Sequence, residues 1–232
     1  LEVNELKKSF VSPDGERTMI VDVPRFAVDD AHQIALQGSS GSGKTTFLNL
    51  IAGILKPDSG DISLAGQNLS KLSEAGRDRI RAQSIGYVFQ NGALFDSMNV
   101  FENVRLGITN EDQFRDEAYC QERVARCLKL VNLTPETARK FPAQLSGGMR
   151  KRVGISRAIA GTPKYLLYDE PTSGLDPVNS DIIDELVKSL AAELGVTSVM
   201  VTHDVRGAFR VADRLALLTG GKIVQQGTPK EF

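Results

Sequence analysis

The sequence has only two cysteines, no excess of charge of either sign and no long apolar run. Lys and Arg number 28 against 29 Asp and Glu, which gives a net charge of −1. A chain with so little net charge has no overall field that would hold nucleic acid or an anionic bilayer. We therefore expect no nucleic-acid partner, and specific partners must be recognised by local surfaces.

The short apolar runs exclude a membrane span, and residues 1–8 lack the apolar stretch of a signal peptide. We therefore expect a soluble, cytoplasmic chain. Cys120 and Cys127 lie seven residues apart in a helical pattern, which separates them by about 10 Å of rise. That is beyond disulfide reach, so both are expected to be reduced packing or surface residues.

A glycine-rich loop follows the apolar, strand-like residues 34–36 and precedes a helical pattern that ends near Gly53 and Pro57. The candidate nucleotide-binding residues are Gly38, Ser39, Ser40, Gly41, Ser42, Gly43, Lys44, Thr45 and Thr46. In such a loop the backbone N–H groups surround a phosphate, Lys44 supplies a point charge, and the Thr45 hydroxyl is placed for Mg²⁺. The alternative is a glycine-rich surface turn, which the order of strand, loop and helix disfavours. The chain is thus predicted to bind a nucleoside triphosphate.

Two carboxylates, Asp169 and Glu170, directly follow the apolar run of residues 165–168. Ligands bind at the carboxyl ends of strands in α/β sheets. We expect Asp169 to hold Mg²⁺, directly or through water, and Glu170 to orient and deprotonate the attacking water. An acid pair seen alone is more often a solvated loop end, but the phosphate-binding loop favours the catalytic interpretation.

Two further polar residues follow strand-like runs. His203 comes after residues 198–201, so its imidazole could reach the terminal phosphate and the catalytic water. Gln90 closes the run 86–89, and its side-chain carbonyl could contact Mg²⁺ or water. The alternative for His203 is a purely structural role. A glutamine such as Gln90 would not indicate a functional site without the other motifs.

A second anion site is predicted immediately before a helix of about residues 150–160. Its residues are Leu145, Ser146, Gly147, Gly148 and Met149. Ser146 can cap the helix, and the glycines leave its N–H groups open to a phosphate. An ordinary N-cap is the alternative, and the basic run of residues 150–152 would by default be a solvated face.

Strand and helix periodicities divide the chain. Antiparallel strands are predicted at residues 1–6 and 19–26, around a turn at 12–16. Buried parallel strands are predicted at residues 165–168 and 198–201. A hairpin is predicted at residues 215–218 and 222–224. Between residues 90 and 160 only helices are expected, at 117–131 and 147–160. We predict one domain, 1–232, with an α/β P-loop NTPase (RecA-like) core. An N-terminal antiparallel β subdomain and the core would comprise 1–90 and 161–232, and an inserted helical subdomain would comprise 91–160.

Together these motifs resemble the ATP-binding subunit of ABC transporters over essentially the whole chain. The resemblance implies that residues 38–45 are the Walker A loop, Gln90 the Q-loop glutamine, 145–149 the signature and 165–170 the Walker B strand. It also implies that Asp176 belongs to a D-loop at 173–176, that His203 is the switch histidine and that Phe10 stacks on adenine. A core role is the alternative for Phe10. Met149 stands where the family usually has glutamine, which we expect to leave catalysis intact.

The resemblance also implies the partners. Two copies would form a head-to-tail dimer in which the Walker A loop of one and the signature of the other enclose each ATP, with Mg²⁺, and ADP would be the product. Transmembrane permease subunits would dock near residues 91–104, where Leu94, Phe95, Met98, Val100 and Phe101 form a dense apolar group. The chain would then lie peripherally on the cytoplasmic face of the inner membrane.

The two parts of the chain resemble different transporter ATPases. Residues 1–90 are similar to those of lipoprotein release and macrolide export, and residues 91–232 to those of Mce-associated phospholipid transport. A chimera joined near Gln90 is one explanation, and ordinary divergence is the other. We expect an ATPase of a phospholipid (Mce-type) transporter, with lipoprotein release or macrolide/peptide export as the alternative. A soluble non-transport ABC ATPase and an ATP-dependent regulatory module are alternatives of another class.

Overall fold

The computed structural model describes all 232 residues and divides them into two compact units. The first unit combines residues 1–81 with 197–232, and the second comprises residues 82–196. The second unit thus begins before residue 91 and extends beyond residue 160, the boundaries expected from the sequence. The assignment of 1–232 to a single domain with a helical subdomain at 91–160 stays a prediction.

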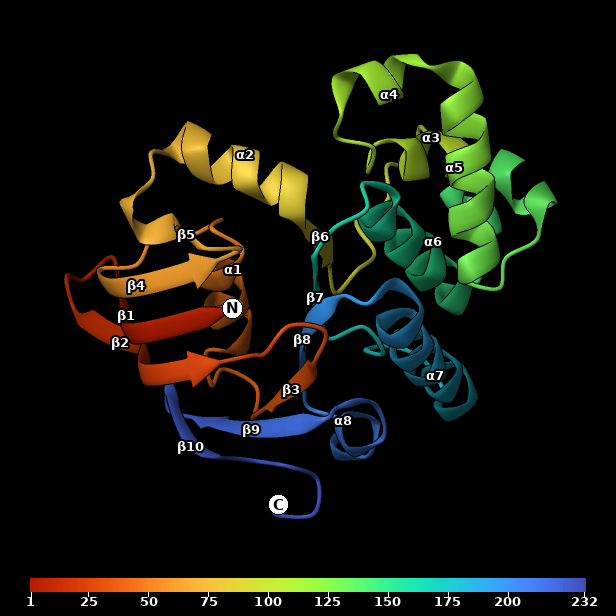
Figure 1. Ribbon diagram of the computed structural model, residues 1–232. Coiled ribbons are helices and arrows are strands. Elements are labelled where there is room, and N and C mark those ends of the chain that lie inside the picture. The colour runs from red at the N-terminus through yellow and green to blue at the C-terminus, as the bar shows by residue number, and fades with distance from the viewer. The chain divides into compact units, whose positions relative to one another are not determined.

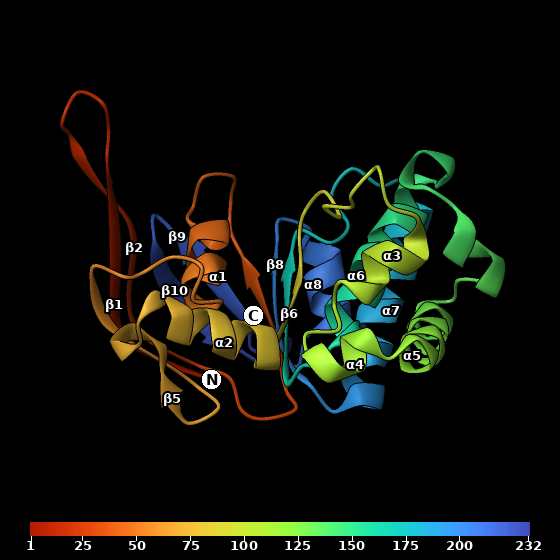
Figure 2. The ribbon, with the colours of Figure 1, turned by 90° about the horizontal axis from the view of Figure 1, so that it is seen from above.

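An antiparallel sheet opens the first unit (Figure 1). It has the order β2-β1-β4-β5, with β1 at Glu2–Val11, β2 at Arg17–Ala27, β4 at Ser59–Leu64 and β5 at Gln67–Asn68. The turn between β1 and β2 is closed by the Ser12 amide, which donates to the Glu16 carbonyl at 2.9 Å. Both strands are longer than their apolar runs predict, and their far end extends away from the rest of the unit in Figure 2.

The first unit has four further strands, and the candidate phosphate-binding loop follows the first of them. They are β3 (Gln33–Gln37), β8 (Thr197–Thr202), β9 (Arg214–Thr219) and β10 (Lys222–Gly227). β3 pairs in parallel with both β8 and β9, and all five of its residues are buried, as expected of a central parallel strand. The predicted hairpin is confirmed: β9 and β10 pair antiparallel across Gly220 and Gly221, both at positive φ.

The helices of the first unit follow its strands. They are α1 (Lys44–Ile51) after β3, the short helix η1 (Leu69–Lys71) after β5, and α8 (Val205–Val211) after β8. Phe47, Leu50 and Ile51 of α1 are fully buried, as their helical spacing predicts, and Leu48 is buried with them. Ile54, expected on the same face, lies beyond the end of α1 and is 42% exposed. α2 (Glu74–Ser84) leads into the second unit.

The second unit contains two parallel strands and most of the helices. The strands are β6 (Ile85–Val88) and β7 (Tyr165–Asp169); the helices are α3 (Val100–Arg105), α4 (Glu111–Arg115), α5 (Glu117–Leu130), η2 (Pro135–Arg139), η3 (Pro142–Gln144), α6 (Gly147–Ala160) and α7 (Pro177–Leu194). No strand lies between residues 90 and 160, as predicted. None of the chain's helices combines the length and apolarity needed to cross a bilayer.

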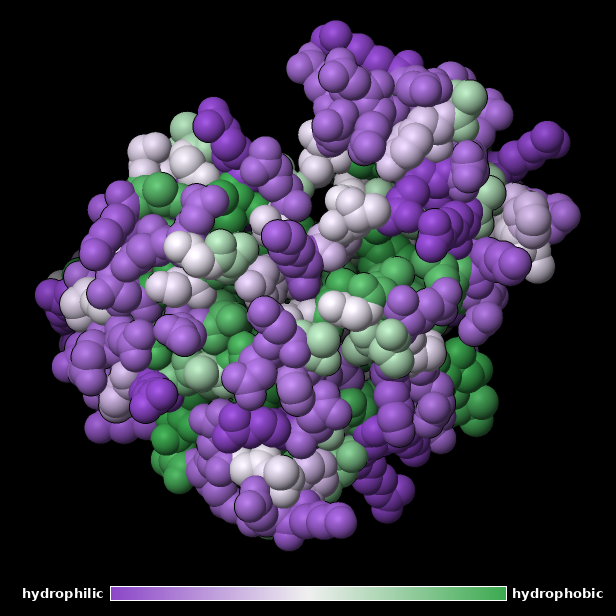
Figure 3. Space-filling model, viewed as in Figure 1, coloured by the Kyte–Doolittle hydropathy of each residue, from purple (hydrophilic) through white to green (hydrophobic).

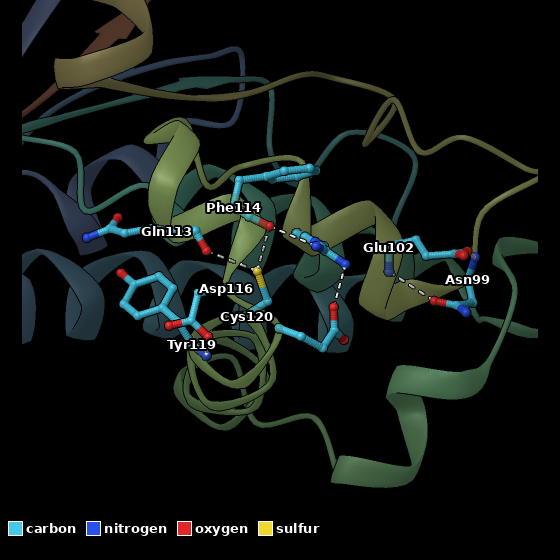
Figure 4. Close-up of polar contacts among 9 residues, drawn as sticks. Asn99, Glu102, Gln113, Phe114, Asp116, Tyr119 and Cys120 are labelled. Atoms are coloured by element: carbon cyan, nitrogen blue, oxygen red, sulfur yellow. Dashed lines mark hydrogen bonds and ion pairs between the residues drawn. The ribbon is translucent and has the colours of Figure 1, made fainter.

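Polar contacts fix the short helices of the second unit (Figure 4). The Arg105 guanidinium contacts Glu117 at 2.9 Å, donates to the Phe114 carbonyl at 2.7 Å and lies over the Phe114 ring. Cys120 is fully buried, and its Sγ lies 3.4 Å from that same carbonyl. Cys127 is also buried, and both thiols are free, so the packing interpretation of the two cysteines is confirmed.

Candidate functional site

The glycine-rich loop lies between β3 and α1, in the order that the sequence predicts. Gly41 and Gly43 have φ of 77° and 100°, a region that L side chains rarely adopt. A Cβ at Gly38 would lie 2.4 Å from the Leu218 carbonyl oxygen, and one at Gly43 would lie 2.6 Å from the Ile20 carbonyl oxygen. These three positions therefore require glycine for the loop to keep its shape.

The loop offers hydrogen-bonding groups to an anion. Gly43 is the N-cap of α1 and provides no side-chain cap, so the first N–H groups of the helix lack the usual side-chain acceptor. The Ser42 hydroxyl is buried and has no hydrogen-bond partner in the protein. A buried hydroxyl beside an uncapped helix start fits a phosphate, which would accept from both.

Lys44 supplies the positive charge at this loop. Its side chain is largely buried, and Nζ donates to the carbonyl oxygens of Gly38 at 2.7 Å and Ser39 at 3.1 Å. The ammonium therefore lies across the loop rather than in the solvent. Thr45, the predicted Mg²⁺ ligand, is exposed at the first turn of α1.

His203 lies at the same edge of the first unit as this loop. Gln37 of β3 pairs with Thr202 of β8, so the residues that follow each strand, Gly38 and His203, leave neighbouring parallel strands at corresponding positions. His203 is exposed. This placement is the one expected for a residue near the terminal phosphate.

Phe10 lies near the end of β1 and is 44% exposed, so it is not a core residue. The Lys8 ammonium lies 5.5 Å from the centroid of its ring. An exposed aromatic ring is available for stacking, and the adenine role of Phe10 stays a prediction.

In the second unit, Asp169 ends β7 and Glu170 follows it, as the sequence predicts. Both residues are buried, so they do not form the solvated loop end that was the alternative. Burial, with a smaller contribution from the Asp169 charge, raises the pKa of the Tyr87 hydroxyl on the neighbouring strand β6. Glu170 has φ of 48°, the left-handed region that is uncommon for a residue with a side chain.

Gln90 lies beyond the end of β6, next to β7. Its side-chain amide donates to the Ser173 hydroxyl at 3.3 Å, and the Ser173 amide donates to the Glu170 carbonyl at 3.1 Å. The structure therefore connects the predicted Q-loop residue with the segment that follows the predicted catalytic base.

The signature segment forms the start of α6. The Ser146 hydroxyl accepts a hydrogen bond from the Met149 amide at 3.2 Å, which confirms Ser146 as the N-cap. A Cβ at Gly148 would lie 2.8 Å from Oδ1 of Asn179, whereas Leu145 is buried below the turn. The cap is present, and its role toward a phosphate on a second copy stays a prediction.

Asp176 of the predicted D-loop caps α7. Its carboxylate accepts from the backbone amide of Asn179 at 3.0 Å and from the side-chain amide at 2.6 Å, and these bonds lower its pKa. Val178 and Ile182, farther along α7, are exposed apolar residues. Figure 3 shows a hydrophobic area at the place of α7, on a face that is otherwise mostly hydrophilic.

The predicted basic face is wrong for one of its three residues. Arg150 is exposed as expected, but Lys151 is buried, and its Nζ donates to the backbone carbonyls of Gln90 and Glu170. Burial lowers the pKa of Lys151, an effect that the negative charges of Glu170 and Asp169 oppose. No periodicity distinguishes Lys151 from its neighbours, because a basic residue beside two others reads as solvated.

Asn103 was also not identified from the sequence. It is fully buried on α3, and its Nδ2 donates to the carbonyls of Phe95 at 3.1 Å, Met98 at 3.0 Å and Asn99 at 3.0 Å. Its Oδ1 accepts from the Phe95 amide at 2.8 Å. Asn103 therefore holds the loop in which Phe95 is 54% exposed and Val100 is fully buried, so the apolar group of residues 94–101 is neither all core nor all surface.

No cluster of acidic or other metal-binding side chains marks a Mg²⁺ site. The chain has no group of three or more His, Cys, Asp or Glu residues that could hold a metal ion. The candidates are a hydroxyl on Thr45, a carboxylate on Asp169 and an amide carbonyl on Gln90. Hard oxygen donors with a single carboxylate suit Mg²⁺, which takes its remaining ligands from phosphate and water.

Comparison with known proteins identifies the family. The family model described as "ABC transporter" matches residues 21–173. The chain is 38% identical over 233 residues to a sulfate/thiosulfate import ATP-binding protein of Bacillus cereus, covering 100% of this chain and 62% of that protein. It is 40% identical over 232 residues to an Fe(3+) ions import ATP-binding protein of Rhodococcus jostii, covering 100% of this chain and 63% of that protein. The chain thus spans about three fifths of the length of these curated relatives.

A solved structure shares the fold. A dimeric ATP-binding cassette in a post-hydrolysis state, bound to ADP and Pi, superposes with a TM-score of 0.89 at 30% identity, covering 100% of this chain and 99% of that one. The two relatives align across both sides of Gln90, so the comparisons do not support a chimera. Their names also do not support the expected lipid cargo. The chain belongs to the ABC transporter family and has the fold of its ATP-binding cassettes, which are ATP hydrolases.

Proposed function

We propose that this chain binds ATP through residues 38–46 and hydrolyses it to drive a membrane transporter. The observation that carries the proposal is the uncapped, glycine-lined start of α1, where the buried Ser42 hydroxyl has no protein partner. A triphosphate would satisfy these groups and place its negative charge beside Lys44. Phe10 is proposed to stack on the adenine.

The remaining roles are proposed for residues at strand ends and helix starts. Glu170 is proposed to take the proton of the attacking water, with His203 and Gln90 orienting that water and the terminal phosphate. Asp169, Thr45 and Gln90 would hold Mg²⁺, which neutralises phosphate charge when bound. The signature residues 145–149 and Asp176 would act on the nucleotide of a second copy in a head-to-tail dimer, as the dimeric cassette with ADP and Pi suggests.

Phosphate release from ATP by the purified chain tests this proposal. We expect turnover with Mg²⁺ and ATP, and loss of turnover when EDTA removes the metal, because the loop amides and the single charge of Lys44 leave much of the triphosphate charge uncompensated. AMP added in place of ATP is the matched control for the phosphate chain. Metal-independent turnover, or none with Mg²⁺ at high chain concentration, would contradict the proposal.

We propose that the partner is a membrane permease that docks on residues 91–104. The mixture of exposed Phe95 with half-buried Leu94, Met98 and Phe101 supports docking there. The names of the two import relatives favour uptake of a small ion. Phospholipid transport is the second candidate, because residues 91–232 resemble ATPases of that class. Identification of the membrane subunit that co-purifies with the chain distinguishes the two candidates.

Asn103→Asp should disorder the proposed docking loop. The substitution keeps the shape of the side chain but replaces the donor to three carbonyls with carboxylate oxygen, and leaving buried groups unpaired costs about 1–3 kcal/mol. We expect a lower free energy of unfolding, faster amide exchange at residues 95–99 and weaker permease binding. Asn91→Asp, at an exposed position of the same segment, is the control. Equal exchange and binding in the two variants would contradict this role of Asn103.

A further inference from the structure

We propose that Lys151 is a positioning residue for hydrolysis, which fixes the backbone at Gln90 and Glu170 and thereby sets the direction of both side chains. This inference rests on the proposed role of Glu170 as the base. Lys151 acts through these two residues and is not proposed to contact the nucleotide. Lys151 lies on α6, the signature helix, and its side chain reaches both segments from there.

The contacts of Lys151 close a ring of hydrogen bonds within the second unit. Nζ donates to the Gln90 carbonyl and, at 3.3 Å, to the Glu170 carbonyl. On the opposite side, the Gln90 side chain donates to the Ser173 hydroxyl at 3.3 Å, and the Ser173 amide donates to the Glu170 carbonyl at 3.1 Å. Lys151 thus connects the segment that follows β6 with the segment that follows β7.

The backbone of Glu170 requires such support. At φ of 48° a residue with a side chain is in a strained conformation, and it persists only where surrounding contacts hold it. Two of those contacts are the donors to its carbonyl oxygen, from Lys151 and from Ser173. Without the ammonium, one of the two restraints on the peptide group that orients the base is lost.

The chemistry of the side chain also distinguishes Lys151 from its neighbours. It is 7% exposed, whereas Arg150 is exposed and the Arg152 guanidinium donates to the Asn132 carbonyl. A buried ammonium needs hydrogen-bond acceptors for its three donors, and backbone carbonyls beside two carboxylates provide both acceptors and opposite charge. Only this residue of the basic run is placed to link the catalytic segments.

Lys151→Met tests the inference, because methionine fills similar volume without a donor. We expect kcat for ATP hydrolysis to fall by about 10²-fold, the effect of a small misplacement of a catalytic group, with the affinity for ATP unchanged. Lys129→Met, at an exposed position of α5, should retain full turnover. Full turnover by folded Lys151→Met, or a loss of ATP affinity as large as the loss of kcat, would overturn the inference.

A double-substitution cycle separates positioning from general stabilisation. In the Glu170→Gln background, adding Lys151→Met should lower the residual single-turnover rate by less than about tenfold, much less than in the wild-type background, since one of the two groups that it positions is already inactive. If the two substitutions instead lower the hydrolysis rate independently, so that their fold-losses multiply, the inference would be overturned. If Lys151→Met does not fold, Lys151→Gln takes its place. Glutamine keeps an amide donor but lacks the reach and the charge of the ammonium, so we expect a reduced kcat, and a folded Lys151→Gln with unchanged kcat would equally overturn the inference. Inactive wild-type chain would instead refute the proposed function.

Discussion

Glu170→Gln is expected to slow ATP hydrolysis by about 10²–10⁴-fold while leaving ATP binding intact. Glutamine has nearly the same shape as glutamate, so it can still hold a water, but it cannot take the proton. Glu170 is 8% exposed and directly follows Asp169, the last residue of β7. The effect should therefore appear in kcat and not in the affinity for ATP.

Single-turnover hydrolysis and equilibrium binding of ATP, measured on the same preparation, check this expectation. Glu122→Gln, at an exposed position of α5, makes the same chemical change away from the site and should be silent. Because hydrolysis would separate the proposed dimer, the Glu170 variant should also accumulate as an ATP-bound dimer in sedimentation. Near-normal turnover by Glu170→Gln would assign the proton transfer to another residue.

Lys44→Met is expected to weaken ATP binding by about 10–10²-fold. Hydrogen bonds to charged groups contribute about 1.5–3 kcal/mol each, and a factor of ten in affinity corresponds to about 1.4 kcal/mol. Lys44 is 7% exposed and now donates to the carbonyls of Gly38 and Ser39, so an arriving phosphate would take over this preplaced charge. Methionine removes the charge and keeps most of the packing.

Calorimetric titration with ATP measures the affinity, and thermal unfolding without nucleotide shows whether the loop itself has been damaged. Lys56→Met, at an exposed position after α1, is the matched control. Unchanged ATP affinity in a folded Lys44→Met chain would mean that the triphosphate binds elsewhere. Loss of affinity together with a lower unfolding temperature would instead indicate that the lysine's main role is to hold the loop carbonyls.

The parts of the site that are local in sequence could be predicted. The loop at residues 38–45 depends on glycine conformations and on the strand and helix that flank it, all within one short segment. The positions of Asp169, Gln90 and His203 depend only on where apolar strands end. For the same reason the β9–β10 hairpin and helices α5 and α6 were read with nearly the bounds that the structure has.

The parts that depend on contacts distant in sequence could not be predicted. Lys151 lies 61 residues from Gln90, and nothing in the basic run shows which side chain turns inward. Asn103 is polar yet fully buried, because the loop before it presents backbone carbonyls to be satisfied. α2 consists mostly of charged and small residues and buries few of its side chains, so its apolar periodicity is weak.

The transporter class illustrates a further limit. The resemblance of separate segments to export and lipid-transport ATPases suggests a chimera joined near Gln90. Alignment over the whole chain instead finds relatives named for sulfate/thiosulfate and Fe(3+) import. Residues that bind a triphosphate are determined by phosphate chemistry and carry no information about cargo. We expect such information in the proposed docking segment, residues 91–104.

A bound triphosphate must occupy the backbone amides of the loop, and amide NMR shifts during nucleotide titration measure this occupancy directly. We predict saturable shifts of the amides of residues 41–46 with ATP and ADP and little change with AMP, which lacks the β- and γ-phosphates. Unperturbed amides at these residues under ATP concentrations that saturate binding would contradict the account.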